Sequence, residues 1–293
     1  MENINWYPGH MKKTRELIAE NLRLVGAVVE VCDARIPVSS RNPILKELTS
    51  GRPRVLALNK SDLADERATR AWCGAMKPDA ALALNSVSGE GVKHLLSVLA
   101  RIEKERTKQG RLRIMIVGVP NVGKSSLINR LAGRKAAMTG DRPGVTKGKQ
   151  WLTLENGMQL LDTPGILWPK FEDPDVGRNL AFCGSIRDEI LDVPDLALEL
   201  LRVLVSRYRD VLTARYGLEP DDTQWFTPEG ERAEGLADTE EALAYMDAVA
   251  RRRGCILPGK RIDYERVGRL LLDEFRAGRI GRITLEAAHG RED

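Results

Sequence analysis

Short apolar runs alternate with amphipathic stretches over the first 177 residues, and this alternation is typical of an α/β domain. The runs predicted as strands are residues 27–32, 54–58, 81–84, 113–117, 149–154 and 158–161. Each loop that carries a chemical motif follows one of these runs. Ligands of open α/β sheets bind at the carboxyl ends of the strands, so these loops are expected to converge on one crevice.

The pattern changes to a helical period from about residue 176. One helix is expected to open at Pro194, a second to begin with a capping box at Asp238, and a third to be capped by Asp263. The apolar positions expected on these helices are Leu198, Leu201, Val205, Tyr208 and Leu212, then Leu243, Met246 and Val249, then Val267, Leu270, Leu271 and Phe275. We therefore predict two domains, an α/β domain over residues 1–175 and an all-α domain over residues 176–293.

Charge is unevenly shared between these two parts, although the formal net charge is only +4. Residues 1–177 hold 28 Lys+Arg against 19 Asp+Glu, a net charge of +9, whereas residues 178–293 hold 18 against 23, a net charge of −5. The basic half fits a polyanionic partner. It equally fits a nucleotide site, which needs basic residues in any case.

Several classes of protein are excluded by composition. The four cysteines stand far apart and form no C-x-x-C pair, so neither a disulfide framework nor a zinc site is expected. The amino terminus has no signal pattern, and no run approaches the ~20 apolar residues that span a bilayer. We expect a cytoplasmic protein with no membrane partner.

The run from Gly118 to Ser125 has the form of a phosphate loop between an apolar strand and a helix. Gly118 and Gly123 let the backbone N–H groups turn toward phosphates. Lys124 supplies a charge to the β- and γ-phosphates, and the helix that follows points its positive end at the same anion. The residues expected to bind nucleotide here are Asn121, Val122, Gly123, Lys124, Ser125 and Ser126.

Magnesium chemistry is expected around the same loop. The Ser125 hydroxyl is predicted to ligate Mg²⁺ directly, and Asp162 of Asp162-Thr-Pro-Gly165 to hold it through water. The Gly165 N–H can bond the γ-phosphate. Thr146, between Gly144 and Gly148, is our choice for the hydroxyl that reaches Mg²⁺ when the γ-phosphate is present; the alternative is an ordinary Pro-Gly turn.

Two further loops fit guanine recognition. In Asn59-Lys60-Ser61-Asp62 the Asp62 carboxylate can accept from guanine N1 and N2, the Lys60 stem can cover the base, and Asn59 can tie loops together. Adenine lacks that donor pair, which favours GTP over ATP. Asn85-Ser86 fits the loop whose backbone N–H meets the guanine oxygen, although alone it reads as a turn.

The base loop at Asn59 precedes the phosphate loop, whereas ordinary GTPases have the reverse order. The fold class predicted is therefore a circularly permuted P-loop GTPase domain with a mixed, mostly parallel sheet, followed by the helical domain. Its motif order, together with Trp6-Tyr-Pro-Gly-His-Met11, Asp33-Ala-Arg-Ile-Pro37 and residues 278–285, resembles ribosome biogenesis GTPase A, the YlqF/RbgA family. This resemblance covers nearly the whole chain. It implies a monomeric GTPase acting late in maturation of the large ribosomal subunit, with a helical domain that touches rRNA.

Catalysis departs from the usual GTPase pattern. Ile166 follows Gly165 where many GTPases have a water-positioning Gln, so hydrolysis by the isolated protein is expected to be slow. His10 is a candidate to act once the ribosomal particle orders its segment, the alternative being a structural His beside a Pro-Gly turn. By resemblance, Asn121 implies a K⁺ ion in place of an arginine finger. The rival function is a non-catalytic guanine-nucleotide sensor.

Two expectations concern the second domain. The candidates for RNA contact are residues 251–253, Lys260, Arg261, Arg276, Arg279 and Arg282, which could instead form solvated charged faces. The permuted order also leads from Gly165 directly toward the helical domain. Loss of the γ-phosphate could therefore reposition that domain.

Overall fold

The computed structural model describes residue 16, residues 19–49, 51–76, 80–106, 110–133, 150–162 and 173–219, residue 222, and residues 237–288. Contacts divide the chain into two compact units. The first holds the described residues up to Gly177 together with those from Glu286 onward, and the second is Arg178–Leu285. The predicted boundary placed everything after residue 175 in the second domain, whereas Glu286 packs with the first unit.

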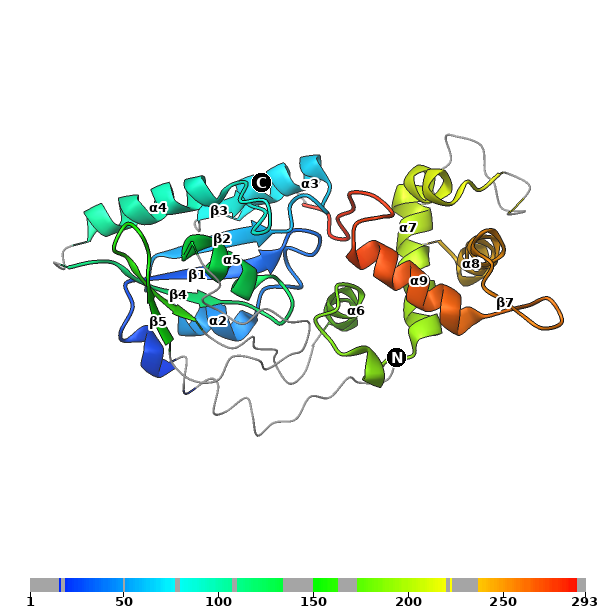
Figure 1. Ribbon diagram of the computed structural model, residues 1–293, viewed down its shortest axis with the longest axis horizontal. Helices are drawn as coiled ribbons and strands as arrows, with labels where there is room; N and C mark the ends of the chain where they lie inside the picture. The colour runs from blue at the N-terminus through cyan, green and yellow to red at the C-terminus, as the bar shows by residue number, and fades with distance from the viewer. Residues whose placement is uncertain are drawn as a thin grey trace. The chain divides into compact units, whose positions relative to one another are not determined.

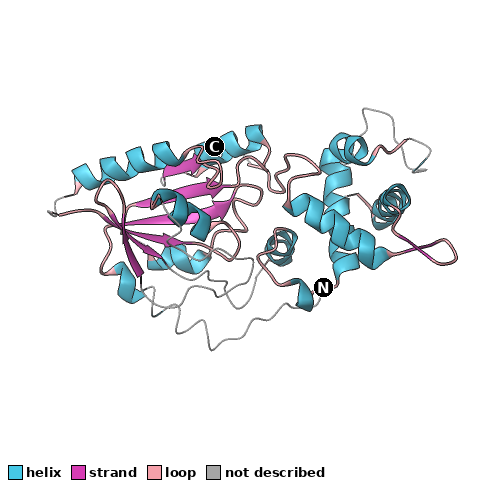
Figure 2. Ribbon diagram, in the orientation of Figure 1, coloured by secondary structure: helices cyan, strands magenta, loops and turns pink. Residues whose placement is uncertain are grey.

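A six-stranded sheet forms the centre of the first unit, with helices around it (Figures 1 and 2). The strand order is β3-β2-β1-β4-β6-β5, and only β5 is antiparallel to its neighbour. The strands are β1 (Ala27–Asp33), β2 (Arg54–Asn59), β3 (Ala80–Ala83), β4 (Arg113–Val117), β5 (Gln150–Thr153) and β6 (Gln159–Asp162). The prediction of a mixed, mostly parallel sheet is confirmed, and each predicted strand lies within one or two residues of an observed strand.

The core of this unit is built on the central strands. All seven residues of β1 are buried, as expected for a parallel strand that is covered on both faces. Five of the six residues of β2 are buried as well. The helices of the unit are α2 (Pro43–Leu48), α3 (Glu66–Ala75), α4 (Val92–Glu105) and α5 (Lys124–Leu131), while α6 (Pro174–Phe182) spans the division between the units.

The second unit is helical, as predicted, apart from one small hairpin. Three long helices pack together, α7 with both α8 and α9, and the hairpin joins α8 to α9 (Figure 1). The hairpin's two-residue strands are too short for sequence periodicity to reveal. The elements are a 3₁₀ turn (Asp188–Ile190), α7 (Val193–Tyr216), α8 (Thr239–Arg253), β7 (Ile256–Leu257), β8 (Arg261–Ile262) and α9 (Tyr264–Arg276).

The predicted caps of these helices are present, whereas some predicted apolar positions are not buried. Asp238 accepts a hydrogen bond from Glu241 N, and Asp263 accepts one from Arg266 N. Leu243 is 37% exposed, because the buried side of α8 runs through Tyr245, Met246 and Val249 instead. Tyr208 has non-helical φ and ψ and marks a kink in α7, which its place in an apolar period did not predict. No helix in the described part of the chain has the length and apolar character needed to cross a membrane.

Candidate nucleotide-binding site

The phosphate loop follows β4 and needs glycine at two positions. Gly118 has φ 153°, and a Cβ there would lie 2.4 Å from Val31 O. Gly123 has φ 95°, and a Cβ there would lie 2.2 Å from Asn59 Nδ2. These φ values strongly favour glycine, and only glycine has no side chain, so the loop can pack closely against β1 and the base loop. A larger residue at either position would push the loop away from β1 or from Asn59.

The helix after this loop, α5, begins at Lys124 with Gly123 as its N-cap. Its first backbone N–H groups have no partners within the helix and carry the positive end of its dipole, which favours an anion there. Lys124 is 8% exposed, and its Nζ donates to Val119 O at 2.8 Å. The ammonium group is therefore held over its own loop, where a phosphate group would meet it.

Asn59, the last residue of β2, joins three loops. It is 1% exposed, its Nδ2 donates to Val122 O at 2.7 Å, and its Oδ1 accepts from Ser86 N at 2.9 Å. One amide side chain thus fixes the phosphate loop and the second base loop relative to the first base loop. Both ends of the amide are satisfied, so its burial is not penalised.

The second base loop forms a compact turn after β3. The Asn85 side chain accepts from Val87 N and Ser88 N at 2.8 and 3.1 Å. Ser86 O accepts from Arg130 Nε of α5 at 3.2 Å. These bonds, with that of Ser86 N to Asn59, hold the loop beside the phosphate loop. The contact of its backbone with the guanine oxygen stays a prediction.

A buried ionic cluster supports the first base loop. Asp33, at the end of β1, accepts from Arg35 Nε and Nη2 at 3.0 and 2.8 Å, and Lys60 Nζ lies 3.0 Å from Asp33 Oδ2. Burial opposes ionisation, but the charges of Arg35 and Lys60 outweigh it, so the pKa of Asp33 lies well below its usual value. Asp62, the predicted guanine acceptor, is exposed on the turn after Ser61.

The structure therefore brings together the predicted residues of the two base loops and the phosphate loop. Ser61 N donates to Leu84 O at 3.2 Å, which joins the two base loops a second time. Ser125 and Ser126 lie in the first turn of α5, beside Lys124. Asp162 ends β6, next to β4 in the sheet, although its side chain is not described. His10, Thr146 and Gly165 lie outside the described residues.

Comparison with known proteins agrees with this geometry. The chain is 43% identical to ribosome biogenesis GTPase A of Priestia megaterium over 97% of its own length and 96% of the relative. It is 34% identical to the protein of the same name from Thermotoga maritima, over 97% of this chain and 94% of that one. This chain belongs to the ribosome biogenesis GTPase A family.

Solved structures in the ribosome biogenesis GTPase A family share the fold. The GNP-bound crystal structure of YlqF from T. maritima has a TM-score of 0.64 and 29% identity, covering 94% of this chain and 99% of that chain. The GDP-bound structure of TM YlqF has a TM-score of 0.62 and 30% identity, covering 94% and 100%. A family model described as "50S ribosome-binding GTPase" matches residues 113–215. Like the rest of its family, this chain is a GTPase.

The motif order distinguishes ribosome biogenesis GTPase A from ordinary GTPases. The match of the family model begins at Arg113, the first residue of β4, and leaves out Asn59 and the strands before it. The fold nevertheless places Asn59 against the phosphate loop through two neighbouring strands, β1 and β2. The circularly permuted GTPase fold inferred from the sequence is confirmed, and the alternatives of an ATP-dependent enzyme and a non-catalytic sensor are set aside.

Some of the predicted RNA-contacting residues form ion pairs within the second unit. Arg252 pairs with Asp222, Arg253 with Glu274, and Arg276 with Asp188. In contrast, Lys260 and Arg261 are exposed in the β7–β8 hairpin. These three arginines have ion-pair partners within their own unit, and RNA contact by the candidate residues stays a prediction.

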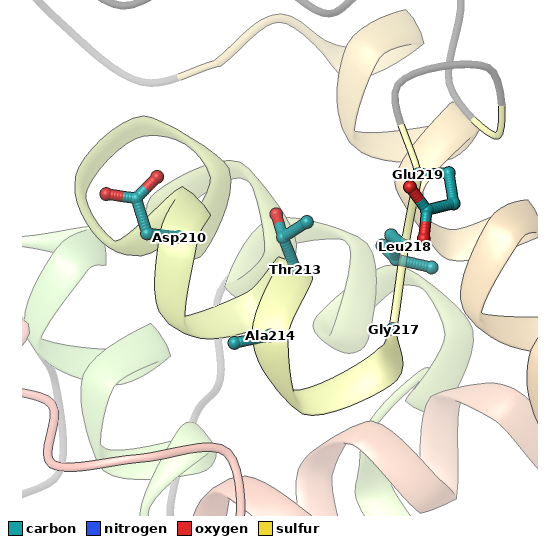
Figure 3. A pocket seen from close by; sticks show the side chains of 6 residues that line it. All are labelled: Asp210, Thr213, Ala214, Gly217, Leu218 and Glu219. Atoms are coloured by element: carbon teal, nitrogen blue, oxygen red, sulfur yellow. The ribbon is translucent and has the colours of Figure 1, made fainter.

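A pocket of about 400 Å³ opens beside the last turns of α7, away from the nucleotide motifs in the sequence (Figure 3). Its lining includes two carboxylates and the carboxyl end of a helix, which disfavour an anion such as a nucleotide phosphate. The lining residues are Asp210, Thr213, Ala214, Gly217, Leu218 and Glu219.

The sequence did not predict one set of contacts in the first unit, those of Glu286. The Glu286 carboxylate accepts from Val38 N, Ser39 N and Ser39 Oγ, and its backbone oxygen accepts from Trp72 Nε1 at 3.0 Å. Ser40 Oγ of the same turn accepts from Asp33 N at 3.0 Å. Glu286 is thus linked indirectly to Asp33, because both bond to the turn that contains Ser39 and Ser40. Residues 39 and 286 are too far apart in the sequence for a local pattern to predict this contact.

Proposed function

We propose that this chain hydrolyses GTP on the maturing large ribosomal subunit, which it binds late in assembly and leaves after hydrolysis. The observation that carries the proposal is the joining of the phosphate loop and both base loops through Asn59, in a chain of the ribosome biogenesis GTPase A family. The relatives' name and the description "50S ribosome-binding GTPase" support the ribosomal partner. The proposed place of action is the cytoplasm, and the function needs only one copy of the chain.

In this proposal the residues of the first unit bind and orient GTP. Lys124 and the first turn of α5 hold the β- and γ-phosphates, and Asp62 accepts from guanine N1 and N2. The Lys60 stem covers the base, and Asn85-Ser86 contacts the guanine oxygen. Asn59 holds these loops at fixed positions relative to each other. Because the base loop follows β2 and the phosphate loop follows β4, the positions of these two strands set the distance between the base site and the phosphate site.

Magnesium fits the donor set of this site. Ser125 offers a hydroxyl oxygen beside the phosphate loop, a hard ligand of the kind Mg²⁺ prefers alongside phosphate oxygens. Ser125, Thr146 and, through water, Asp162 are the proposed protein ligands. Mg²⁺ would neutralise charge that develops on the phosphate oxygens.

Two further proposals concern turnover. Asn121 is the proposed site of K⁺; it has φ 61° in the phosphate loop, a left-handed conformation that is uncommon for residues other than glycine. His10 is the proposed catalytic group that acts when the ribosomal particle orders its segment, and the Gly165 N–H is the proposed γ-phosphate donor. Hydrolysis by the isolated chain is therefore expected to be slow, and faster in K⁺ than in Na⁺.

The deciding experiment is GTP hydrolysis with and without purified large ribosomal subunits in K⁺ buffer, with small subunits as the control particle. We expect stimulation of about ten-fold or more by the large subunit alone. Equal rates with either particle, or with none, would contradict the proposed partner. His10→Ala should remove the stimulation. His94→Ala, which changes an exposed histidine of α4, should keep it.

The second unit is the proposed rRNA contact, and the exposed hairpin is its most suitable part. Lys260 and Arg261 can reach phosphates without breaking an internal ion pair that the structure gives. The double variant Lys260→Ala/Arg261→Ala should weaken particle binding and reduce its salt dependence. Arg269→Ala is the control, because it also removes a positive charge from an exposed position of the second unit, but on α9 and away from the hairpin in sequence. An unchanged salt dependence in the double variant would count against the hairpin.

A further inference from the structure

The ionic cluster at Asp33 lies beside the base loop, and Lys60 is the member whose stem is expected to contact GTP. The Asp33 side chain is 2% exposed and faces two cations, Arg35 and Lys60. Arg35 is itself 1% exposed, and its backbone N as well as its guanidinium donates to Asp33. Because Arg35 alone already supplies a bidentate partner, the contact of Asp33 with Lys60 calls for a separate explanation.

Lys60 is held at both ends. Its backbone has φ 59°, which is uncommon for a side chain of this size, and it directly follows Asn59, whose backbone oxygen accepts from Ala34 N at 2.8 Å. Its ammonium group lies 3.0 Å from Asp33 Oδ2, and its side chain is 25% exposed. Because both ends are fixed, the four methylene groups between them can adopt few conformations.

Confinement of this kind matters for binding. A lysine side chain has several rotatable bonds, and ordering it when a ligand binds weakens the observed affinity. A lysine that is ordered before the ligand arrives avoids that loss. The buried Asp33 is a suitable anchor, because its lowered pKa keeps it charged throughout the physiological range.

We propose that Asp33 is a positioning residue for guanine binding, which acts by holding the Lys60 ammonium so that the stem of Lys60 lies ready to cover the base. The proposal rests on the predicted contact between Lys60 and guanine. According to this proposal, the Asp33-Ala-Arg segment increases the affinity for guanine nucleotides, in addition to packing at the end of β1.

The test is a double-mutant cycle with GDP as the ligand, measured by isothermal titration calorimetry on the full chain. Asp33→Asn should weaken GDP binding by about two- to ten-fold, the range expected for ordering one long side chain. Lys60→Met keeps an apolar stem but loses the ammonium, and should weaken binding to a similar extent. In the Lys60→Met background, Asp33→Asn should then cause no further loss.

A structural role for Asp33 predicts a different result. If Asp33 acted only by pairing with Arg35, its replacement would weaken binding equally in both backgrounds, and additivity would overturn the proposal. Asp65→Asn is the matched control, because it neutralises a nearby carboxylate that caps α3, a task that Asn can also perform. It should leave the affinity for GDP unchanged.

Inosine diphosphate separates this effect from recognition by Asp62. It lacks the guanine amino group, so it should bind less tightly than GDP to every variant that keeps Asp62. Since the Lys60 stem contacts the face of the ring, Asp33→Asn should weaken both ligands by the same factor and leave their ratio unchanged. A changed ratio would mean that Asp33 acts on Asp62. If ADP bound as tightly as GDP, the guanine site itself would be wrong, whatever Asp33 does.

A second comparison covers the case in which Asp33→Asn does not fold because Arg35 loses its counter-charge. Lys60→Arg keeps a cation that can still reach Asp33, so its affinity for GDP should be closer to that of the unsubstituted chain than that of Lys60→Met. Equal affinity of the Lys60→Met variant and the unsubstituted chain would overturn the proposal without any change at Asp33.

Discussion

Apart from the buried ionic cluster at Asp33, the two units of this protein join their elements through different kinds of polar side chain. In the nucleotide-binding unit, short neutral groups such as Asn59 and Asn85 lie at the ends of strands and bond to the backbone of loops. In the helical unit, long charged side chains join helices to each other, as Arg215 and Arg253 do with Glu274. A short amide fixes its partner's backbone closely, whereas an arginine can adapt to small shifts of a helix. Changes in the first unit should therefore affect GDP affinity, and changes in the second should affect stability.

The largest effect is expected from Gly123→Ala. The added Cβ would lie 2.2 Å from Asn59 Nδ2 on a backbone with φ 95°, so the phosphate loop or Asn59 has to move. We expect a loss of GDP affinity of about 100-fold or more, measured by calorimetry. Gly217→Ala is the control: it too has positive φ, 61°, but its Cβ would meet no atom within 4 Å. Similar losses of GDP affinity in both variants would show that the effect is not specific to the phosphate loop.

Asn59→Ala comes next. It leaves Val122 O and Ser86 N without the partner that joins them, and each broken bond to a buried group destabilises by about 1–3 kcal/mol. GDP affinity should fall by about ten-fold or more, because the loops are no longer held in register. Asn156→Ala removes a side-chain bond confined to the β5–β6 turn and should leave the affinity unchanged. If Asn59→Ala kept the GDP affinity of the unsubstituted chain, changes in the first unit would not act on affinity as proposed.

Glu274→Gln tests the helical unit. Burial opposes its ionisation, but hydrogen bonds from Arg215 and the charges of Arg253 and Arg215 lower the pKa of Glu274 overall. The substitution should destabilise this unit by about 1–3 kcal/mol at neutral pH, seen as faster hydrogen exchange in α8 and α9, with GDP affinity unchanged. Glu265→Gln, on the exposed side of α9, should have little effect.

The effect of Glu274→Gln should also depend on pH. Since folding lowers the pKa of Glu274, its stabilising contribution is fully present above its unfolded pKa of about 4.3. That contribution disappears as the pH falls through the lower value of the folded state. The difference in exchange between the variant and the unsubstituted chain should therefore narrow below about pH 4. A difference that stayed constant there would mean that the ionised form of Glu274 is not what stabilises the unit.

The smallest effect is expected at a helix end. Asp238 caps α8 by accepting from Glu241 N at 2.7 Å, so Asp238→Ala should destabilise the helical unit by about 1 kcal/mol. Asp238→Asn keeps an acceptor and should be nearly neutral. Hydrogen exchange in the first turn of α8 measures both. A change in GDP affinity in either variant would show that the contrast between the units is incomplete.

The sequence was sufficient for the strands and for the positions of the phosphate loop and the two base loops because their signals are local. Apolar runs such as 113–117 stand out from the polar loops that follow them, and the glycines of the phosphate loop have conformations that few other residues can take. The tie made by Asn59 could be anticipated, since an amide at the end of a strand faces the next loop. Its partners could be named only once the order of the strands was known.

The rest depends on contacts that sequence spacing does not encode. The pairing of Asp33 with Lys60 requires β1 and β2 to end side by side, which follows from their register and not from either motif. The helical unit's arginines were candidates either for RNA contact or for solvated charged faces, and their internal ion pairs, such as that of Arg276 with Asp188, join residues too far apart in the chain to be predicted. Glu286 had no local pattern at all. Apolar periods therefore predicted the elements, whereas ion pairs between distant residues became visible only with the fold.

The position of Glu286 makes the helical unit an insertion with two attachments. The chain leaves the first unit after Gly177 and rejoins it at Glu286, while Arg207 Nη1 holds Leu285 O within the helical unit. If the helical unit unfolds while Glu286 stays bound to Val38 and Ser39, about a hundred residues form a closed loop, which has less conformational freedom than a free tail. The unfolded form is thereby disfavoured. A ligand that displaced Glu286 would open the loop and lower the resistance of the helical unit to unfolding, without touching any of its helices.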